Sequence, residues 1–225
     1  MYQMDKNNKV YLSGEIVTKA EFSHEVYGEG FYEMMVSVKR LSGQEDVLPI
    51  TISERLILDK DLKEGSNIFA LGQFRSYNKL IDGKSKLMLT VFIKELLEEE
   101  RSKNPNTIVL SGYVCKEPIY RTTPFNREIA DLLIAVNRSY NKSDYIPCIA
   151  WGRNARFVQN LAVGERVSLS GRIQSREYQK RTEDDVKKMT AYEVSISKIA
   201  ASANVESFDL DKEFISFSYE NNFQE

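Results

Sequence analysis

The chain has 225 residues, of which 42% are hydrophobic and 28% charged, so it has enough material for two small domains or one large one. No apolar run approaches the roughly 20 residues that cross a bilayer, and residues 1–10 are too polar for a signal peptide. These features argue against a protein with spanning helices and predict a cytoplasmic one. Cys115 and Cys148 each lie inside a strand-like run, where free buried thiols are expected rather than a structural disulfide.

The net charge of −2 conceals an uneven distribution along the chain. Residues 1–100 carry 13 Lys and Arg against 17 Asp and Glu, residues 101–200 carry 17 against 10, and residues 201–225 carry 1 against 6. The middle of the chain is therefore basic, with a net charge of +7, between an acidic first part and an acidic tail. We expect a polyanion to bind the basic part.

The chain contains an internal repeat. Asn8–Ile16 (NKVYLSGEI) matches Asn106–Val114 (NTIVLSGYV) at an offset of 98 residues. Nearly the same offset relates further blocks: Phe31–Arg40 to Ile129–Arg138, Asp46–Ile50 to Asp144–Cys148, Leu62–Phe74 to Leu161–Ile173, and Leu89–Leu96 to Tyr192–Ile199. Chance does not hold one register over separate blocks, so the sequence indicates a duplicated domain, with the drift in offset placed in polar hairpins that tolerate insertions.

Each copy predicts the same order of elements. A strand with a Leu-Ser-Gly core is followed by a loop, a long second strand, a polar hairpin and a third strand. A short helix comes next, at Glu54–Leu62 or Asn154–Leu161, and the glycine a few residues later is expected to cap it. A fourth strand with an interior glycine (Gly72 or Gly171), a hairpin and a fifth strand complete the copy. This order predicts an all-β protein of two tandem OB-folds, which are five-stranded Greek-key barrels whose strands bend sharply at such glycines.

We therefore divide the chain into four parts. Residues 1–97 form the divergent, acidic first OB-fold, and residues 98–106 form a charged linker that contains Asn-Pro. Residues 107–201 form the basic second OB-fold, and residues 202–225 form an acidic tail that is rich in aromatic residues.

The segment Arg138–Arg153 (RSYNKSDYIPCIAWGR) reads as the end of one strand, a polar turn at Asn141–Asp144 and the whole next strand. Alternate residues of that strand are expected on opposite faces: Tyr145, Pro147, Ile149 and Trp151 on one, and Ile146, Cys148 and Ala150 on the other, toward the core. Tyr140 lies across the hairpin, with Arg138 and Arg153 beside the rings. Flat rings interleaved with guanidinium groups suit unpaired bases and their phosphates. Ordinary core or interface packing is the alternative explanation for these rings.

Several motifs of the second copy follow one another in a fixed order: Ile108–Gly112 (IVLSG), Lys116–Arg121 (KEPIYR), Ile134–Arg138 (IAVNR), Tyr145–Gly152 (YIPCIAWG), Asn160–Arg172 (NLAVGERVSLSGR), Arg176–Tyr178 (REY) and Tyr192–Ile199. In these motifs and their order, the second copy resembles the bacterial single-stranded DNA-binding protein family. The resemblance covers nearly all of residues 104–200, whereas the first copy resembles the family only through the repeat.

The resemblance implies a protein that binds single-stranded DNA without sequence preference in DNA replication, recombination and repair. In that family aromatic rings stack on bases while Arg and Lys hold the phosphates. Carried onto this sequence, the stacking rings are Tyr140, Tyr145, Trp151 and Tyr178, and the cations along the backbone are Arg121, Arg138, Arg172 and Arg176. Arg153, beside the hairpin, completes the predicted DNA-binding set. For Trp151, packing under a helix explains the ring equally well.

The first copy departs from this pattern. Val47 and Ser53 stand where the second copy has Tyr145 and Trp151. Its remaining candidate binding residues form either a small binding patch or simply a solvated surface: Arg40, Arg75, Tyr77 and Lys79. We therefore expect the second barrel to hold DNA best and the first to supply mainly an assembly surface.

The resemblance also implies partners. Members of the family commonly assemble four OB-folds, so a chain with two of them implies a homodimer. Members often end in an acidic, Asp-rich segment with a Pro-Phe tip that recruits replication and repair proteins, whereas this chain ends in Asn-Asn-Phe-Gln-Glu. We expect its tail to dock on the chain's own barrel, with recruitment of another partner as the alternative. Association with the nucleoid, and not with a membrane, follows from DNA binding.

Nothing in the sequence predicts an enzyme, a cofactor or a metal site. The single histidine, His24, lies in a polar loop, and two strand cysteines do not form a metal site. The Gly-rich segment Tyr27–Phe31 reads as a hairpin turn rather than a phosphate-binding loop. Two other functions stay open, namely a primosomal-type OB-fold adaptor that acts mainly through protein contacts and an RNA-binding OB-fold module. The duplication and the hairpin of rings and arginines favour single-stranded DNA.

Overall fold

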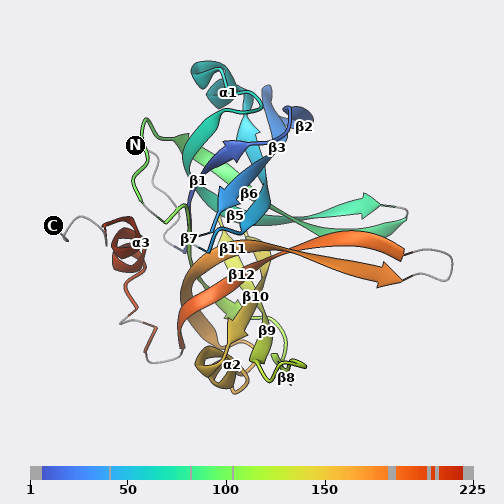
Figure 1. The fold of residues 1–225 in the computed structure, drawn as a ribbon, viewed down its shortest axis with the longest axis vertical. Helices are drawn as coiled ribbons and strands as arrows, with labels where there is room; N and C mark the ends of the chain where they lie inside the picture. The colour runs from blue at the N-terminus through green and yellow to red at the C-terminus, as the bar shows by residue number, and fades with distance from the viewer. Residues whose placement is uncertain are drawn as a thin grey trace.

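The computed structural model describes residues 7–40, 42–81, 83–102, 104–181, 186–201, 204–205 and 208–219. In this part of the chain the first copy comprises β1 (Asn8–Ile16), β2 (Glu21–Val26), β3 (Glu29–Lys39), β4 (Glu45–Ser53), α1 (Glu54–Lys60), β5 (Asn67–Ile81) and β6 (Lys84–Leu96). The second comprises β7 (Asn106–Val114), β8 (Ile119–Thr122), β9 (Glu128–Arg138), β10 (Lys142–Trp151), α2 (Arg153–Val158), β11 (Arg166–Arg181) and β12 (Val186–Ala201), and α3 (Leu210–Tyr219) follows. Figure 1 shows one copy above the other, with α1 and α2 at the two far ends. No helix in these described ranges has the length and apolar character needed to cross a bilayer.

Each copy closes into a small barrel. In the first barrel β1 pairs with β3 and β5, β3 with β4, and β5 with β6, all antiparallel, while a short parallel pairing of β4 with β6 closes the ring. The second barrel repeats these pairings with β7, β9, β10, β11 and β12. The predicted all-β class with two tandem OB-folds is therefore confirmed. Each barrel also has a short extra strand, β2 or β8, in the segment that the sequence predicted as a loop.

Alternation of side chains along the strands builds the core. Met34, Val36 and Val38 on β3 are buried, whereas Met35 and Ser37 between them are only half-buried. Burying a large aliphatic side chain contributes roughly 1.5–3 kcal/mol, so this alternation fixes the register of each strand. Cys115 and Cys148 are both free thiols, as predicted. Cys148 is buried, and burial raises the pKa of its thiol, whereas Cys115 is only partly buried, contrary to the prediction.

Gly72 and Gly171 lie at the predicted sharp bends of the fourth barrel strands. The pairing of β5 with β6 shifts register between Leu71 and Gly72, and that of β11 with β12 shifts between Ser170 and Gly171. A Cβ atom at either glycine would overlap a backbone carbonyl oxygen of the neighbouring strand. Glycine is therefore required at both positions for the strands to close the barrel.

The helices end earlier than predicted, and the predicted capping glycines are wrong. Asp61, with a left-handed φ of 48°, caps α1, and Gln159 in an ordinary helical conformation caps α2. Gly65 and Gly164 lie farther along, with φ angles of 87° and 85°. Their N–H groups donate to carbonyl oxygens at the ends of β1 and β7, so these glycines form the turn that leads into β5 or β11.

The two barrels are joined edge to edge by their first strands. β1 and β7 pair antiparallel, and the equivalent residues Val10 and Ile108 lie directly opposite each other. The equivalent N–H groups of Ser13 and Ser111 each donate, at 2.8 Å, to the segment that precedes the first strand of the other copy. The sequence repeat is therefore also a twofold pseudosymmetry in space.

The helix of the acidic tail, α3, packs against β7 and β11, to the left of the barrels in Figure 1. Lys9 on β1 forms an ion pair with Asp211. Glu213 accepts hydrogen bonds from Lys198 Nζ at 3.0 Å and from Ser170 Oγ at 3.4 Å. The expected docking of the tail on the chain's own barrel is confirmed for this helix, whereas residues 220–225, which include the closing Asn-Asn-Phe-Gln-Glu, lie outside the described residues.

Candidate nucleic-acid interface

The β9–β10 hairpin has its turn at Tyr140 and Asn141, whose φ angles are 63° and 54°. Arg138 and Lys142 already pair across the hairpin on either side of this turn. The predicted turn, which extended to Asp144, therefore lies too far along the chain. Asp144 is a buried strand residue, because contacts with the first barrel hold it, as described below.

The outer face of β10 carries two of the predicted rings. Tyr145 and Trp151 are 46% and 40% exposed, and Pro147 between them is half-buried. Ile149 shares their parity but is buried. The opposite parity faces the core as predicted: Ile146, Cys148 and Ala150.

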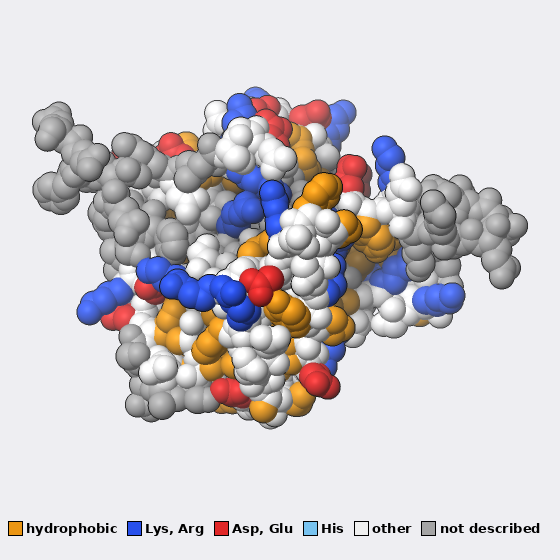
Figure 2. Space-filling model, turned by 60° about the horizontal axis from the view of Figure 1, so that its bottom comes forward, with side chains coloured by type: hydrophobic (Ala, Val, Ile, Leu, Met, Phe, Trp, Pro, Cys, Tyr) orange, Lys and Arg blue, Asp and Glu red, His pale blue; other side chains and the backbone are white. Residues whose placement is uncertain are grey.

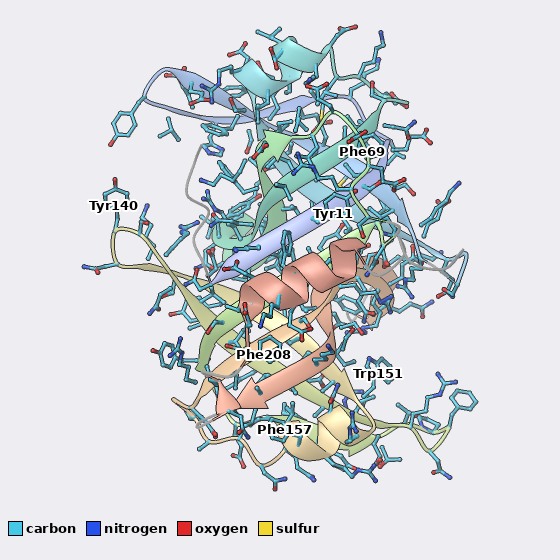
Figure 3. The ribbon with its side chains drawn as sticks, turned by 90° about the vertical axis from the view of Figure 1, so that its left-hand side faces the viewer. Tyr11, Phe69, Tyr140, Trp151, Phe157 and Phe208 are labelled. Atoms are coloured by element: carbon cyan, nitrogen blue, oxygen red, sulfur yellow. The ribbon has the colours of Figure 1, made fainter. Side chains whose placement is uncertain are left out.

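The rings of the hairpin are spread along the strand rather than gathered in one cluster. Tyr140 is 94% exposed at the tip of the hairpin. Figure 3 shows Tyr140 and Trp151 at opposite ends of the second barrel, with the length of β10 between them. A ligand that contacts both the Tyr140 and the Trp151 ring therefore has to extend along β10.

Tyr178 and Arg176 lie together on the arm that β11 and β12 extend beyond the barrel (Figure 1). Tyr178 is 39% exposed, and the Arg176 guanidinium carbon is 5.9 Å from the centre of its ring. Arg176 Nε also lies 3.4 Å from Glu193 Oε1, which holds the guanidinium beside the ring. The pair presents a π-face and a positive charge next to each other.

The other predicted arginines occupy different parts of the second barrel. Arg121 on β8 donates to Asp131 Oδ2 at 2.8 Å, and Arg153 is exposed at the first residue of α2. Arg172 lies at the junction of the barrels, where it donates to Gln174 Oε1 at 3.1 Å and where burial lowers the pKa of its guanidinium. These cations therefore lie on β8, on α2 and at the junction of the barrels, and they do not form one cluster.

Trp151 is the last residue of β10 and lies at the α2 end of the second barrel. Other exposed apolar side chains of this barrel come from β8, α2 and the loops: Ile119, Phe125, Phe157 and Val163. Figure 2, which brings this end forward, shows hydrophobic and Lys or Arg side chains next to one another. The Trp151 ring is thus neither a core residue nor a neighbour of the hairpin tip.

Each barrel places a buried carboxylate against the other. Asp46 Oδ1 accepts a hydrogen bond from the Ser175 N–H, and Asp144 Oδ1, its equivalent in the second copy, accepts one from the Ser76 N–H, both at 2.8 Å. The two carboxylates are 0% and 1% exposed. The sequence contained a signal for this pair, an Asp at the same register three residues before a Pro in both copies, but sequence analysis missed its role.

The arginine partners of these carboxylates differ in how tightly they bind. Arg40 donates to the two carboxylate oxygens of Asp46 at 2.6 and 2.7 Å, whereas Arg138 Nη1 lies 3.5 Å from Asp144 Oδ1. Burial favours the protonated form of both carboxyls, but the Arg40 and Ser175 hydrogen bonds outweigh it and lower the pKa of Asp46. For Asp144 burial prevails, and the pKa is raised. Arg138, a predicted DNA contact, is therefore held more loosely than its counterpart.

The outer face of the first barrel carries a column of stacked flat groups that sequence analysis missed. The His24 ring stacks on Phe31 with centroids 5.2 Å apart and planes inclined by 12°, and Phe31 is 5.5 Å from Phe92. The Arg75 guanidinium carbon lies 3.8 Å from the centre of the Phe92 ring. We call these four residues the ring column. The prediction that His24 lies in a loop is wrong, since it is an exposed residue of strand β2.

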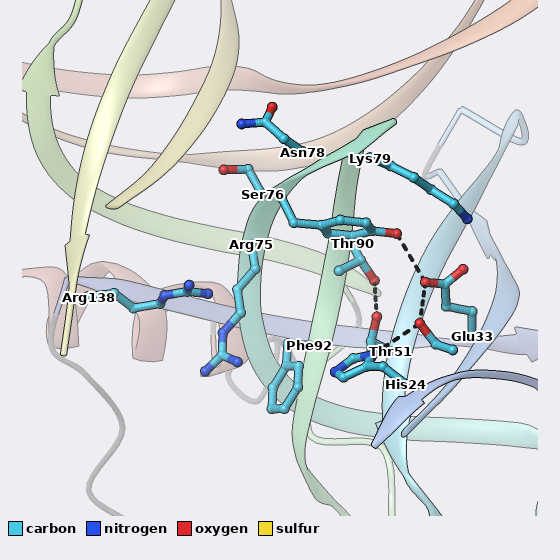
Figure 4. A pocket seen from close by; sticks show the side chains of 12 residues that line it. His24, Glu33, Thr51, Arg75, Ser76, Asn78, Lys79, Thr90, Phe92 and Arg138 are labelled. Atoms are coloured by element: carbon cyan, nitrogen blue, oxygen red, sulfur yellow. Dashed lines mark hydrogen bonds between the residues drawn. The ribbon is translucent and has the colours of Figure 1, made fainter. Parts of the chain in front are cut away.

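A cavity of about 430 Å³ opens beside the ring column, and Figure 4 shows its lining. His24 and Arg75 line it, together with Arg138 from the second barrel. Tyr77 also lines it, with its O–H donated to Glu33 Oε1 at 3.0 Å. Burial, followed by the charge of Glu33, raises the pKa of Tyr77 to about 12. The cavity thus combines rings of the first barrel with cations from both barrels.

These surfaces offer rings and cations rather than ligands for a metal. Among the residues that the structure describes, no three His, Cys, Asp or Glu side chains converge on a possible ion. The arrangement can instead provide stacking for flat bases and charge for phosphates.

Comparison with known sequences agrees with this geometry. Residues 105–202 match the sequence model of the Single-strand binding protein family. Single-stranded DNA-binding protein 1 of Staphylococcus aureus (strain COL) is 38% identical over 81 residues, which cover 33% of this chain and 48% of that protein. Single-stranded DNA-binding protein A of Bacillus subtilis (strain 168) is 36% identical over 81 residues, which cover 33% of this chain and 47% of that protein. The chain therefore spans about half the length of the curated relatives it matches.

A solved structure has the same fold. The wild-type single-stranded DNA binding protein from Thermus aquaticus is similar with a TM-score of 0.64 and 20% identity, over 87% of this chain and 93% of that chain. A likeness at this identity shows the fold, and it extends over both barrels. The resemblance of the second copy is thereby confirmed, since residues 105–202 match the model of the Single-strand binding protein family.

Proposed function

We propose that this chain binds single-stranded DNA without sequence preference. The observation that carries the proposal is the outer surface of the second barrel, where Tyr145 and Tyr178 are exposed and Arg176 lies over the Tyr178 ring. A stacked base contributes roughly 1–3 kcal/mol whatever its identity, because every base has a π-face. Lys and Arg add a phosphate term that is equally independent of sequence and that weakens with salt.

Two further observations support this function. The barrel that carries these rings lies in residues 101–200, which have a net charge of +7. The relatives from Staphylococcus aureus and Bacillus subtilis are named single-stranded DNA-binding proteins. We extend that activity to this chain and, with it, a role in DNA replication, recombination and repair next to the nucleoid, with replication and repair proteins as partners.

The proposal gives each predicted residue a role. Tyr145 and Tyr178 stack on bases, Tyr140 contacts the strand at the hairpin tip, and Trp151 contacts it at the α2 end. The phosphates lie along the cations of the same barrel: Arg121, Arg138, Arg153, Arg172 and Arg176. No catalytic step and no cofactor enters this function.

We also propose that two chains assemble into a homodimer with four OB-folds. Each chain already contains two barrels that share one sheet through β1 and β7, so the unit that assembles is a rigidly paired set of barrels. Such a dimer would present two basic barrels to one DNA strand.

Substitution of the proposed stacking rings tests the function. Tyr145→Ala and Tyr178→Ala are each expected to weaken oligo-dT binding by roughly 1–3 kcal/mol, because each removes one stacked base contact. With an oligo-dT of about 8 nucleotides, which one OB-fold accommodates, Tyr77→Ala should cost far less, because the hydroxyl of Tyr77 is bound to Glu33 and its ring belongs to the first barrel. Fluorescence anisotropy of a labelled oligo-dT measures all three affinities.

Tyr113→Ala is a matched control for this experiment, since Tyr113 is an equally exposed ring of the second barrel outside the proposed set. It should bind like the wild type. Equal losses for Tyr77→Ala and for the two proposed rings would contradict the assignment of stacking to the second barrel. Tighter binding of oligo-rU than of oligo-dT would favour the RNA-binding module instead.

A further inference from the structure

The first barrel presents flat groups and cations of its own, at positions that the second barrel does not use. Val47 and Ser53 replace the two rings that the second copy has on β10. The ring column instead draws its members from β2, β3, β5 and β6. This surface is therefore not a weakened copy of the second barrel's face but a separate arrangement.

The ring column opens into the cavity beside it. His24, Phe92 and Arg75 line the cavity, whereas Phe31 lies behind them and packs on both rings. Figure 4 shows the Arg75 guanidinium on one side of Phe92 and His24 on the other. A planar base that enters meets an imidazole, a phenyl ring and a guanidinium plane, which are the groups on which unpaired bases stack in proteins.

The charges around the cavity favour a polyanion, although the first copy is acidic as a whole. Among the described lining residues the cations are Arg75, Lys79 and Arg138, and the one carboxylate is Glu33. Glu33 accepts the Tyr77 O–H at 3.0 Å and so is held on the wall of the cavity. Asp144, which lies behind the lining, pairs with Arg138 at 3.5 Å, so three cations face two carboxylates and one net positive charge remains for phosphates that flank a bound base.

The second barrel reaches this cavity through its β9–β10 hairpin. Arg138, the last residue of β9, lines the cavity directly. The Tyr145 N–H donates to Ser76 Oγ of the first barrel at 2.7 Å, and Ser76 also lines the cavity. A strand that stacks on Tyr145 therefore has the first-barrel cavity beside it.

We propose that this cavity is a second base-stacking site for the same single strand, formed by His24, Phe92 and Arg75 of the first barrel and Arg138 of the second. The inference rests on the proposed function and extends it, because it adds the path by which the strand leaves the second barrel. The ligand is an unpaired base with its flanking phosphates, and Arg138 contacts the backbone where the strand crosses the junction. The first barrel then binds DNA rather than serving as an assembly surface alone.

Oligonucleotide length separates the two sites. An OB-fold accommodates about 4–16 nucleotides, so an oligo-dT of about 8 nucleotides fills the second barrel and one of about 35 nucleotides reaches both. Phe92→Leu keeps an apolar side chain against Phe31 but removes the ring, and Arg75→Gln removes the guanidinium. We expect each to weaken binding of the long oligonucleotide about fivefold or more and to leave that of the short one within about twofold.

Two control substitutions make the same kinds of change in the first barrel, at residues that do not line the cavity. Tyr27→Ala removes a fully exposed ring from the β2–β3 turn of the same barrel, and Arg55→Gln removes an exposed cation from α1. Both should bind both oligonucleotides like the wild type. Photo-crosslinking of a long oligonucleotide that contains 5-iodo-deoxyuridine needs no substitution, and mass spectrometry should locate crosslinks at His24 or Phe92.

The possible outcomes distinguish this inference from the function on which it rests. If Phe92→Leu and Arg75→Gln bind the long oligonucleotide normally while Tyr145→Ala binds both poorly, the second site is overturned and the proposed function stands. Equal losses for short and long oligonucleotides would also overturn it, because the ring column would then belong to the primary site. If the wild-type chain binds neither oligonucleotide, the proposed function itself fails.

Discussion

Asp46 and Asp144 are equivalent residues of the two copies, yet their surroundings shift the pKa in opposite directions. Burial favours the protonated form of both, but the two short hydrogen bonds from Arg40 help to lower the pKa of Asp46. Arg138 is farther from Asp144, burial prevails, and the pKa is raised. Ionised Asp46 therefore stabilises the folded chain at neutral pH, whereas folding disfavours ionised Asp144.

This difference predicts how stability depends on pH. Asp46→Asn should lower the free energy of unfolding at neutral pH by about 1.5–3 kcal/mol, because it removes buried hydrogen bonds to a charged group. The loss should shrink in acid, since the contribution of Asp46 is complete above the ordinary Asp value of 3.8 and disappears as the pH falls through its lowered folded value. Asp144→Asn should cost less at neutral pH. Urea unfolding at neutral and acid pH measures both variants, and equal losses would contradict this account.

Strand alternation makes single residues predictable, but packing between barrels does not. Tyr145, Trp151 and Tyr178 are exposed, and the two on β10 follow from parity alone. The hydrogen bonds of Asp46 and Asp144 link residues that are 129 and 68 positions apart, across the junction of the barrels. No local pattern contains that information, so the polar run ending in Asp144 predicts a turn instead.

The fourth strand of each barrel bends at a glycine, and this gives a prediction for the element. Gly72→Ala and Gly171→Ala should each lower the free energy of unfolding by about 1–3 kcal/mol, because the added methyl group would overlap the neighbouring strand's backbone. Gly30→Ala is the matched control, since the nearest atom to its Cβ is the flexible end of Glu54. Thermal unfolding followed by circular dichroism compares them. A Gly171→Ala chain as stable as Gly30→Ala would show that the strand closes without glycine.

Most elements follow from the repeat, because two copies with one pattern reinforce each other. The strands β2 and β8 do not, since all residues of β2 and most of β8 are exposed and show no alternation of apolar and polar side chains. Missing β2 also concealed the ring column. His24, Phe31 and Phe92 lie in three different strands, and only the pairing of these strands brings the rings into one stack.

At the scale of the whole molecule, the duplication is also a spatial symmetry. The sequence predicted two copies at an offset of 98 residues, and the structure places the equivalent Val10 and Ile108 opposite each other on β1 and β7. The pairing of β1 with β7 was not predictable. Their Leu-Ser-Gly cores indicate barrel strands, but they do not indicate which strand edges join the two barrels. The pairing brings the cavity of one barrel next to the hairpin of the other.

The proposed homodimer has a direct measurement. Light scattering coupled to size-exclusion chromatography should give twice the chain mass of 25.9 kDa at micromolar concentration. The contact between chains is expected outside the part of β7 and β11 that α3 covers. A mass of one chain would contradict the four-barrel assembly and would leave the DNA-binding surface of each chain in place.

The most direct test of the central claim is a titration of the chain with oligo-dT, followed by anisotropy and by the fluorescence of Trp151, the only Trp in the chain. We expect tight binding to oligo-dT, little response to duplex DNA, and a slope of log K on log salt near −0.7 for each phosphate contact, roughly the value for single strands. Quenching of Trp151 would place the strand at the α2 end of the second barrel as well. No binding to oligo-dT at low salt, by either signal, would contradict the claim and would favour an adaptor that acts through protein contacts.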